Sequence, residues 1–334
     1  VIDWESVRIG FAVVTPAHSD LTTIASTTPA AGQRASYTVH SSFDTLVPTF
    51  SVGWAVAPSF RLGGSIEFPY VSLSNTGQLS GEITSATNSR ATLRTLAVSG
   101  STLKLRGTVG LQWDPLSWLK LGALVRSPGL NIKSGGSFQY EGLTTFATGS
   151  RQVFFQDPGV EFQYKLPLEA GLGAAFEFGP FGIEIDVRWH DGTDEYPLYA
   201  STTLGRVVDT TSGTPVTSEF AFPGVSYRAR QTWNGSVGAH WAFSESFVIS
   251  AGAYRDYSPV DPAVGHAFRR VDVIGFRAGV SFRIDKLTAA IGAGWEHGTG
   301  SDNLFPPAGL PVPEETADLT LNTLTILFSV SFKF

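Results

Sequence analysis

Two neighbouring pairs, His190 with Asp191 and Glu296 with His297, carry the side chains that a general acid–base relay uses. A histidine and a carboxylate pass a proton only when they face one another. Successive residues of a β-strand point to opposite faces, so in an extended chain neither pair is arranged for this task. The strings that mark a serine-hydrolase elbow, a zinc protease or a phosphate-binding loop do not occur in the sequence. The sequence therefore predicts a protein that is not an enzyme.

Three acids, Asp191, Asp194 and Glu195, fall in a short polar stretch after His190. Carboxylates at this density can bind a divalent cation at the level of lipopolysaccharide, but a solvated charged loop is the ordinary outcome. The chain has no cysteine, which excludes thiolate metal sites, iron–sulfur clusters and a disulfide framework. We expect no metal site and no cofactor.

The composition of the chain excludes further classes of protein. The 334 residues are 42% apolar and only 16% charged, with a net charge of −6. Basic and acidic residues are interspersed, so there is no electrostatic reason to expect a nucleic-acid partner. No apolar run approaches the roughly 18 residues of a transmembrane helix. The chain opens at Val1 without an apolar leader, which predicts a processed or truncated form.

Residues alternate with period two over long stretches, which is typical of β-strands. In residues 181–190 one face is apolar, and the other carries Glu184, Asp186, Arg188 and His190. Twelve segments show this alternation: 6–15, 37–57, 59–72, 92–113, 117–133, 152–178, 181–196, 225–243, 246–257, 270–284, 287–297 and 319–334. The sequence therefore predicts an all-β, antiparallel sheet with twelve strands.

The connections between these segments alternate between short turns and long polar links. The long links are predicted near 16–36, 73–91, 134–151, 191–224, 258–269 and 298–318. Short turns at one rim and long loops at the other are typical of an outer-membrane β-barrel, in which the apolar face meets lipid. Residues 1–334 then form a single transmembrane domain with both termini on the periplasmic side. The alternative is a large soluble β-sandwich with its apolar face turned inward.

Three stretches carry a family resemblance. They are LKLGALVRSP at 119–128 continued by LNIK at 130–133, KLP at 165–167 leading into AGLGAA at 170–175, and WNGSVG at 233–238 with AGAYRDYSPV at 251–260. In this order they resemble the FadL-type outer-membrane transporters, which carry long-chain fatty acids and other hydrophobic compounds. The resemblance covers roughly residues 45–300. It implies a barrel of fourteen strands closed by an N-terminal hatch. The first segment of this sequence resembles the family's third strand, so either the barrel is a twelve-stranded variant or the sequence begins after the hatch and the first hairpin.

Several charged residues are expected to face the lumen and are the candidates for ligand binding. Arg228 and Arg230 occupy adjacent inward positions on one strand, and guanidinium groups match a carboxylate with two hydrogen bonds. Glu184, Asp186, Arg188 and His190 are the other lumenal candidates. The simpler expectation is that these charges pair with one another across strands, with Arg228 and Arg230 paired to Glu184 or Asp186.

Two further features concern the route of a ligand. Thr15 and Pro16 close the first segment, where a strand end that turns into a loop is the ordinary outcome. The family resemblance implies instead a kink at this position that opens a lateral window to the bilayer. Val260, Val264 and Phe268 make the link near 258–269 apolar enough to capture a greasy solute, or to fold down onto the rim.

We therefore predict a transporter of hydrophobic small molecules, such as long-chain fatty acids, in the bacterial outer membrane. Its expected partners are outer-membrane lipid, lipopolysaccharide and the hydrophobic ligand, with protein partners possible in an outer-membrane assembly. Two alternatives stay open: a general diffusion porin, and a structural barrel subunit of a larger assembly.

Overall fold

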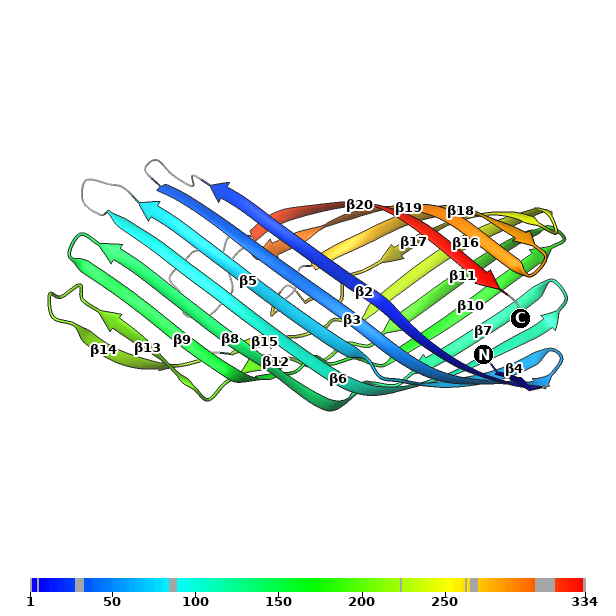
Figure 1. Cartoon of the computed structure of the whole chain (residues 1–334), viewed down its shortest axis with the longest axis horizontal. Coiled ribbons are helices and arrows are strands. Elements are labelled where there is room, and N and C mark those ends of the chain that lie inside the picture. Colours follow the sequence, from blue (N-terminus) through cyan, green and yellow to red (C-terminus); the bar gives the residue numbers. More distant parts are fainter. Residues whose placement is uncertain are drawn as a thin grey trace.

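The computed structural model describes residues 2–4, 6–27, 33–83, 89–222, 224–261, 263–264, 270–303 and 316–332. Within these ranges the chain forms twenty strands and no helix (Figure 1). The strands are β1 (Ile2–Trp4), β2 (Val7–Thr27), β3 (Gln33–Ala57), β4 (Phe60–Glu67), β5 (Tyr70–Ile83), β6 (Arg90–Leu116), β7 (Leu119–Arg126), β8 (Leu130–Phe146), β9 (Gly149–Phe162), β10 (Glu169–Phe178), β11 (Phe181–His190), β12 (Tyr196–Ala200), β13 (Leu204–Asp209), β14 (Val216–Ala221), β15 (Val225–Tyr227), β16 (Thr232–Ser244), β17 (Phe247–Asp256), β18 (Arg270–Ile284), β19 (Leu287–Asn303) and β20 (Thr316–Phe332).

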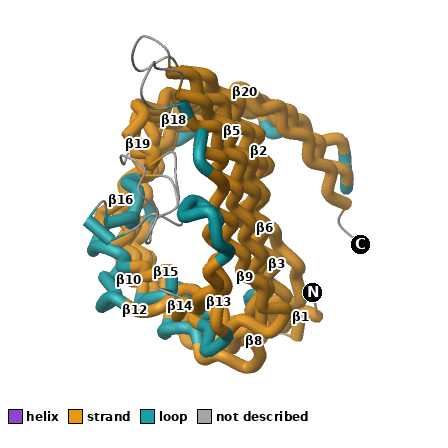
Figure 2. Tube along the Cα trace, turned by 90° about the vertical axis from the view of Figure 1, so that its left-hand side faces the viewer, coloured by secondary structure: helices purple, strands orange, loops and turns teal. Residues whose placement is uncertain are grey.

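All twenty strands belong to one antiparallel sheet that curls round into a barrel. Figure 2 shows β2, β3, β5 and β6 on one side and β10, β16, β18 and β19 on the other. Within the described ranges, β1 pairs only with β2, and β20 pairs only with β19. Among the residues that the structure describes, no ladder joins β20 to β1 or β2. The predicted all-β antiparallel barrel is confirmed, and each of the twelve alternating segments falls on one or more strands.

The short turns gather at one end of the barrel, near the N and C termini in Figure 1. We call this the turn end and the opposite end the link end. Much of what was predicted as long links is strand: β2 and β3 extend into 16–36, β5 and β6 into 73–91, β8 and β9 into 134–151, and β19 and β20 into 298–318. Residues 191–224 contain β12, β13 and β14. These predictions were wrong because apolar alternation was the signal, and a hairpin that extends beyond the hydrocarbon needs no apolar face.

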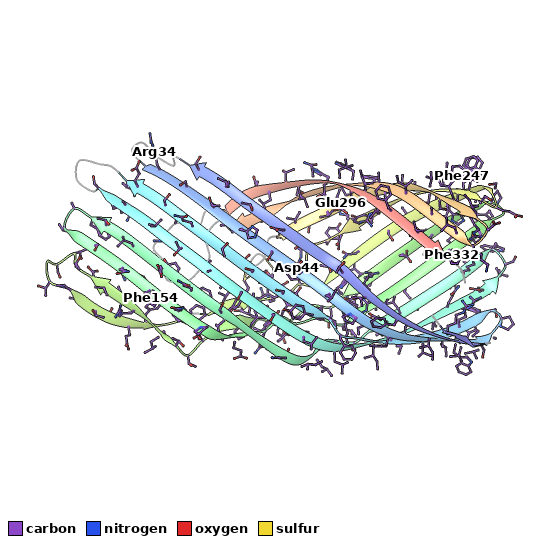
Figure 3. All side chains as sticks on the ribbon, viewed as in Figure 1. Arg34, Asp44, Phe154, Phe247, Glu296 and Phe332 are labelled. Carbon is purple, nitrogen blue, oxygen red and sulfur yellow. The ribbon has the colours of Figure 1, made fainter. Side chains whose placement is uncertain are left out.

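The apolar side chains of the turn-end half point outward. Phe178 on β10 is 53% exposed and Phe328 on β20 is 75% exposed, and neither lines the internal cavity, whereas Glu184 and Asp186 do. In Figure 3 the side chain of Phe247 projects away from the ribbon at this end. Strands β10, β11 and β17 have 10 residues each, the length that a tilted strand needs to cross the hydrocarbon. The predicted outward orientation of the apolar face is thereby confirmed for this half.

A belt of strand breaks separates the two halves of the barrel. We define it by residues 68–69, 127–129, 163–168, 191–195 and 228–231, which interrupt neighbouring strands. Prolines at 69, 128 and 167 lie within it, and proline cannot donate to a ladder. Backbone hydrogen bonds join two of the breaks to the continuous strand β6, with Lys104 donating to Pro69 and Ser127 to Gly107. Others join one break to another: Gly129 to Leu166, Asp191 to Leu168 and Thr193 to Ala229.

Above the belt, the apolar face turns inward. Phe162, Leu198 and Tyr199 are at most 2% exposed, and they pack in one cluster with further aromatic residues of this half: Phe138, Phe155, Tyr196, Phe220, Phe222 and Tyr227. We call this cluster the aromatic core. The prediction of one strand over 152–178 was wrong, because the break at 163–168 separates β9 from β10. Phe162 before the break is buried in the core, and Phe178 after it is exposed on the outer face. In the link-end half, the apolar side chains therefore pack inward, as they do in a soluble protein.

Candidate functional site

The turn-end half encloses a cavity of about 1810 Å³, which is the barrel lumen. Residues from both sides of the barrel line it, including Glu184, Asp186 and Arg188 of β11 and Arg277 and Glu296 of β18 and β19. At the belt, the lumen ends against Tyr164, Tyr227 and Ala229, which pack on or belong to the aromatic core. The polar, charged cavity of the lumen thus borders directly on the apolar aromatic core.

Charges in the lumen are largely paired with one another. Near the turn end, Arg61 Nη1 lies 2.8 Å from Asp114 Oδ2, and Lys120 Nζ lies 3.2 Å from Glu177 Oε1. On the opposite wall, Arg277 Nη2 lies 3.1 Å from Glu296 Oε1. These pairs are partly exposed to the lumen, so each contributes little to stability on its own. They make the lining polar without a single dominant sign.

A more deeply buried cluster of charges lies at the belt. Arg106 Nη2 is 2.9 Å from Glu169 Oε1, and Arg126 Nη1 is 2.9 Å from Glu169 Oε2. Arg126 Nε also lies 3.3 Å from Glu67 Oε1. The Arg106 guanidinium donates hydrogen bonds of 2.8 Å to the backbone carbonyls of Ser127 and Pro167. The cluster therefore supplies partners for backbone groups that the strand breaks leave out of the ladder.

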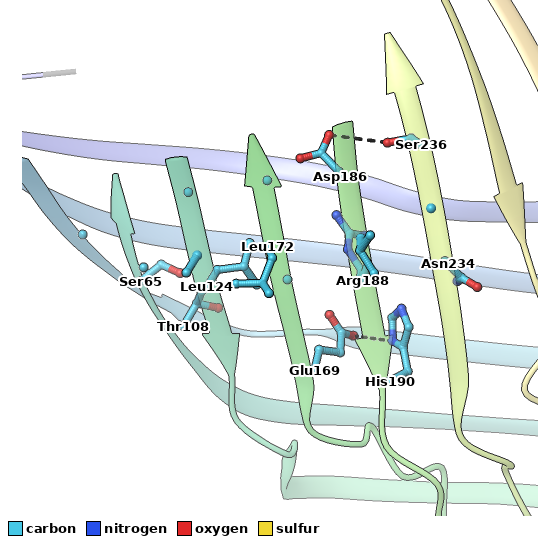
Figure 4. A pocket seen from close by; sticks show the side chains of 18 of the residues that line it. Ser65, Thr108, Leu124, Glu169, Leu172, Asp186, Arg188, His190, Asn234 and Ser236 are labelled. Carbon is cyan, nitrogen blue, oxygen red and sulfur yellow. Dashed lines mark hydrogen bonds and ion pairs between the residues drawn. The ribbon is translucent and has the colours of Figure 1, made fainter. Parts of the chain in front are cut away.

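Four predicted ligand-binding residues, Glu184, Asp186, Arg188 and His190, all line the lumen. Figure 4 shows the last three of them. Ser236 Oγ lies 3.4 Å from Asp186 Oδ2, and His190 Nδ1 lies 3.5 Å from Glu169 Oε1. Register places Glu169 directly beside His190, which puts His190 in the buried cluster at the belt. The predicted pairing of Glu184 or Asp186 with Arg228 and Arg230 is not what the structure has.

Arg228 and Arg230 lie beyond the lumen, in the belt. Arg228 Nε donates to Asp261 Oδ2 at 2.8 Å, while Arg230 Nε donates to the Ser258 carbonyl at 3.0 Å. Arg230 Nη2 also lies 3.5 Å from Asp272 Oδ1. Both guanidinium groups hold the link between β17 and β18 in place. The predicted partners were wrong because β15 and β16 are interrupted at 228–231, which brings this stretch against the link.

The pKa of Asp261 is held below its ordinary value. The backbone N–H of Ala263 donates to the carboxylate at 2.9 Å, and the hydrogen bond from Arg228 adds to this effect. Both donors favour the charged form. The link therefore carries a carboxylate that stays ionised in mildly acidic solution.

The predicted capture residues occupy different environments. Val260 is 5% exposed and packs in the cluster that contains the aromatic core, whereas Val264 is half-buried. The amide of Val264 donates to the Asp261 carbonyl at 3.2 Å. Phe268 lies outside the described residues.

Thr15 and Pro16 form an irregularity within β2 and do not end the strand. Val14 pairs with Val47 and Ala17 with Thr45, so Thr15 and Pro16 together lie opposite Leu46. Two residues opposite one is a β-bulge. The expectation that the strand ends at this position was wrong, because β2 continues to Thr27.

The aromatic core was missed from the sequence as a functional feature. Tyr196, Tyr199, Phe220 and Phe222 all fall in the predicted link 191–224. An ordinary solvated loop has few large aromatic residues. The density of aromatic residues in 191–224 was therefore the signal that could have revealed the core. The Tyr199 hydroxyl is buried without a hydrogen-bond partner among the described residues.

No helix in the described part of the chain is both long and apolar enough to cross a membrane. The residues that the structure describes contain no group of three or more histidine, aspartate or glutamate side chains arranged to hold a metal ion.

The fold and its outward apolar face define an integral β-barrel of the outer membrane. Comparison with solved structures gives the architecture within that class. The chain is similar to the CymD monoaromatic hydrocarbon channel, with a TM-score of 0.51 and 11% identity over 98% of this chain and 87% of that one. It is also similar to the toluene transporter TodX of Pseudomonas putida, with a TM-score of 0.51 and 13% identity over the same shares of the two chains. No protein-family model and no curated protein sequence matches the chain. The FadL-type resemblance is confirmed for the fold.

Proposed function

We propose that this protein carries small hydrophobic molecules across the bacterial outer membrane. The observation that supports the proposal is the meeting of the lumen and the aromatic core at the belt. A packed apolar barrier excludes ions and other polar solutes, because their desolvation there is costly. An apolar molecule can partition into such a barrier without that penalty.

A compact aromatic hydrocarbon suits the aromatic core best. Rings within the core are in contact: Phe155 and Phe222 stack with centroids 4.7 Å apart, and Phe162 and Tyr199 are 5.0 Å apart. The similar proteins named above are described as a toluene transporter and a monoaromatic hydrocarbon channel. Long-chain fatty acids are the larger candidate substrate, and capture by the link that contains Val260, Val264 and Phe268 is the proposed first contact.

The bulge at Thr15 and Pro16 supports a lateral exit into the bilayer. A bulge leaves ladder groups unpaired and bends its strand, so it is the point at which the β2–β3 ladder parts with least cost. A hydrophobic ligand that leaves through this point reaches lipid without entering the aqueous phase. The proposed surroundings on the outer face are outer-membrane lipid and lipopolysaccharide.

Uptake by the full chain in its membrane tests the function. Gram-negative cells expressing the protein are supplied with radiolabelled toluene, and uptake is compared with that of cells expressing an unrelated barrel. Faster uptake supports the proposal, and equal uptake contradicts it. Planar-bilayer conductance distinguishes the porin alternative, since a general diffusion pore gives a large steady current and the proposed transporter does not. A stoichiometric partner in native mass spectrometry would instead favour the structural-subunit alternative.

A further inference from the structure

A second cavity, of about 570 Å³, lies at the belt beside the lumen. Five residues line both cavities: Tyr164, Lys165, Leu166, Pro167 and Asp191. The segment 163–168 therefore separates the two spaces, and the smaller one is a side chamber of the lumen. Its volume is within the range of pockets that hold small organic molecules.

The amine of Lys104 is the unusual feature of this side chamber. Lys104 lies on β6, lines the chamber and is 4% exposed. Among the described residues it takes part in no ion pair and no side-chain hydrogen bond, whereas Arg106, two positions along the same face, is paired with Glu169. A buried ammonium without a counter-ion is costly, so such a group is retained where it has an anion to bind.

The rest of the lining suits a molecule with one anionic group and an apolar body. Leu166, Leu168 and the two prolines at 128 and 167 supply apolar surface, and Tyr164 supplies an aromatic ring. Asn131 adds a polar group near Lys104 on the neighbouring strand; it accepts a 2.8 Å hydrogen bond from Thr102. Lys165, the other cation of the lining, is exposed and lies over the Tyr196 ring, with its Nζ 4.4 Å from the ring centroid. Lys104 is the buried cation of this lining, and it matches one carboxylate.

Three acidic residues, Glu161, Asp191 and Asp194, also line the chamber, and they limit the charge of the ligand. All three are exposed, in contrast to Lys104. Asp191 accepts a 2.8 Å hydrogen bond from the amide of Gly192, and Glu161 accepts one from Gln163. Carboxylates at the rim disfavour a dianion more strongly than a monoanion.

We infer that the side chamber is a binding subsite for small organic monocarboxylates, with Lys104 as the residue that binds the carboxylate. The inference rests on the proposed function and deepens it, since it adds compact apolar acids to the substrates of the same barrel. Lys104 then determines specificity for charge, and the aromatic core selects for apolar bodies.

Benzoate and toluene are matched probes, because they differ in a carboxylate in place of a methyl group. Binding of each to the purified full chain in detergent is measured by titration calorimetry for the wild type, Lys104→Met and Lys104→Arg. Lys133→Met is the matched control, since Lys133 is exposed on the neighbouring strand β8 and lines neither cavity. Lys104→Met removes a buried charge at nearly constant volume, so we expect it to fold, and heat-modifiable migration on gels checks this.

We expect benzoate affinity to fall by more than about tenfold in Lys104→Met and to change little in Lys104→Arg and Lys133→Met. Toluene affinity should be equal in all four proteins. Equal benzoate affinity in the wild type and Lys104→Met, or no benzoate binding to the wild type, overturns the inference while toluene uptake leaves the proposed function standing. Failure of toluene to bind and to enter cells contradicts the proposed function itself. Should Lys104→Met not fold, Lys104→Gln provides the same comparison.

Discussion

Arg106 Nη2 and Glu169 Oε1 lie 2.9 Å apart, although β7 stands between the two strands that carry them. The two side chains are only 6% and 10% exposed. Arg126 on β7 binds the second oxygen of the same carboxylate, so one buried glutamate joins three strands. At the belt, where proline interrupts the ladder, these side chains thus join the strands in addition to the backbone hydrogen bonds between the breaks.

Glu169→Gln should destabilise the barrel strongly. The substitution leaves the buried Arg106 guanidinium without a charged partner, whereas Arg126 keeps Glu67. Removing one partner of a buried ion pair typically costs about 3–5 kcal/mol. Urea unfolding of the protein in lipid vesicles, followed by tryptophan fluorescence, measures the change. Glu177→Gln is the control: its pair with Lys120 is half-exposed, and we expect a loss of no more than about 1 kcal/mol. Equal losses in the two variants would show that the belt cluster does not hold the strands.

Gly100→Ala should also destabilise the protein, through the aromatic core. A methyl group at Gly100 would overlap the ring of Phe162, which is fully buried and has no room to move. Overpacking of this kind costs about 1–3 kcal/mol. At Gly135, on the adjacent strand β8, a methyl group meets nothing within 4 Å, so Gly135→Ala should be neutral in the same unfolding assay. A neutral Gly100→Ala would mean that the core is loosely packed.

The membrane half could be predicted from sequence because lipid imposes a strict rule on it. Alternation in 181–190 placed Glu184 and Asp186 inside and the apolar residues of β11 outside, and the structure agrees. Only a closed sheet with apolar residues outside satisfies both the backbone and the hydrocarbon. That constraint acts on each strand separately, so the alternation within one segment is enough to predict which of its residues face lipid.

The link-end half could not be predicted in the same way. Phe162 and Phe178 have the same parity in the sequence, but the break at 163–168 lies between them and places the first inside and the second outside. Arg228 and Asp261 are 33 positions apart and meet because two interrupted strands bring their links together. Such contacts depend on where breaks in several strands coincide, and no single segment contains that information. Pro16 illustrates the same limit, since a proline signals either a strand end or a bulge.

Deletion of Pro16 should reduce uptake of hydrophobic molecules while the barrel still folds. Without Pro16, Thr15 alone would lie opposite Leu46, which restores a regular ladder between β2 and β3. If the bulge is the proposed exit, toluene uptake by cells should fall several-fold. Thr15→Val keeps two residues opposite Leu46 and should transport normally. Unchanged uptake in the deletion variant would exclude this point as the exit.

The link between β17 and β18 should remain ordered in mildly acidic solution. The pKa of Asp261 is lowered in the folded protein, mainly by the Ala263 amide and further by Arg228, from an ordinary value of 3.8. A lowered pKa means that the stabilisation is complete above the ordinary value and is lost only as the pH falls through the lowered one. Hydrogen exchange at the Arg230 and Ala263 amides, corrected for intrinsic rates, should therefore be equal at pH 7 and pH 5. Asp261→Ala should accelerate both, whereas Asp285→Asn, in the turn between β18 and β19, should not.

The outward face of β20 allows the membrane orientation itself to be tested with two adjacent residues. Leu324 is 74% exposed and lies beside Trp295, while Thr325 occupies the opposite face of the same strand. An arginine in place of Leu324 would enter the hydrocarbon, which costs about 2–4 kcal/mol at the bilayer midplane and less near the interfaces. The same substitution at Thr325 would face the wet interior, where a guanidinium keeps its water. Folding of Leu324→Arg and Thr325→Arg into lipid vesicles, titrated with urea, should therefore give a large loss for the first and a small one for the second. The reverse order would place lipid on the charged face and contradict the barrel as a membrane protein.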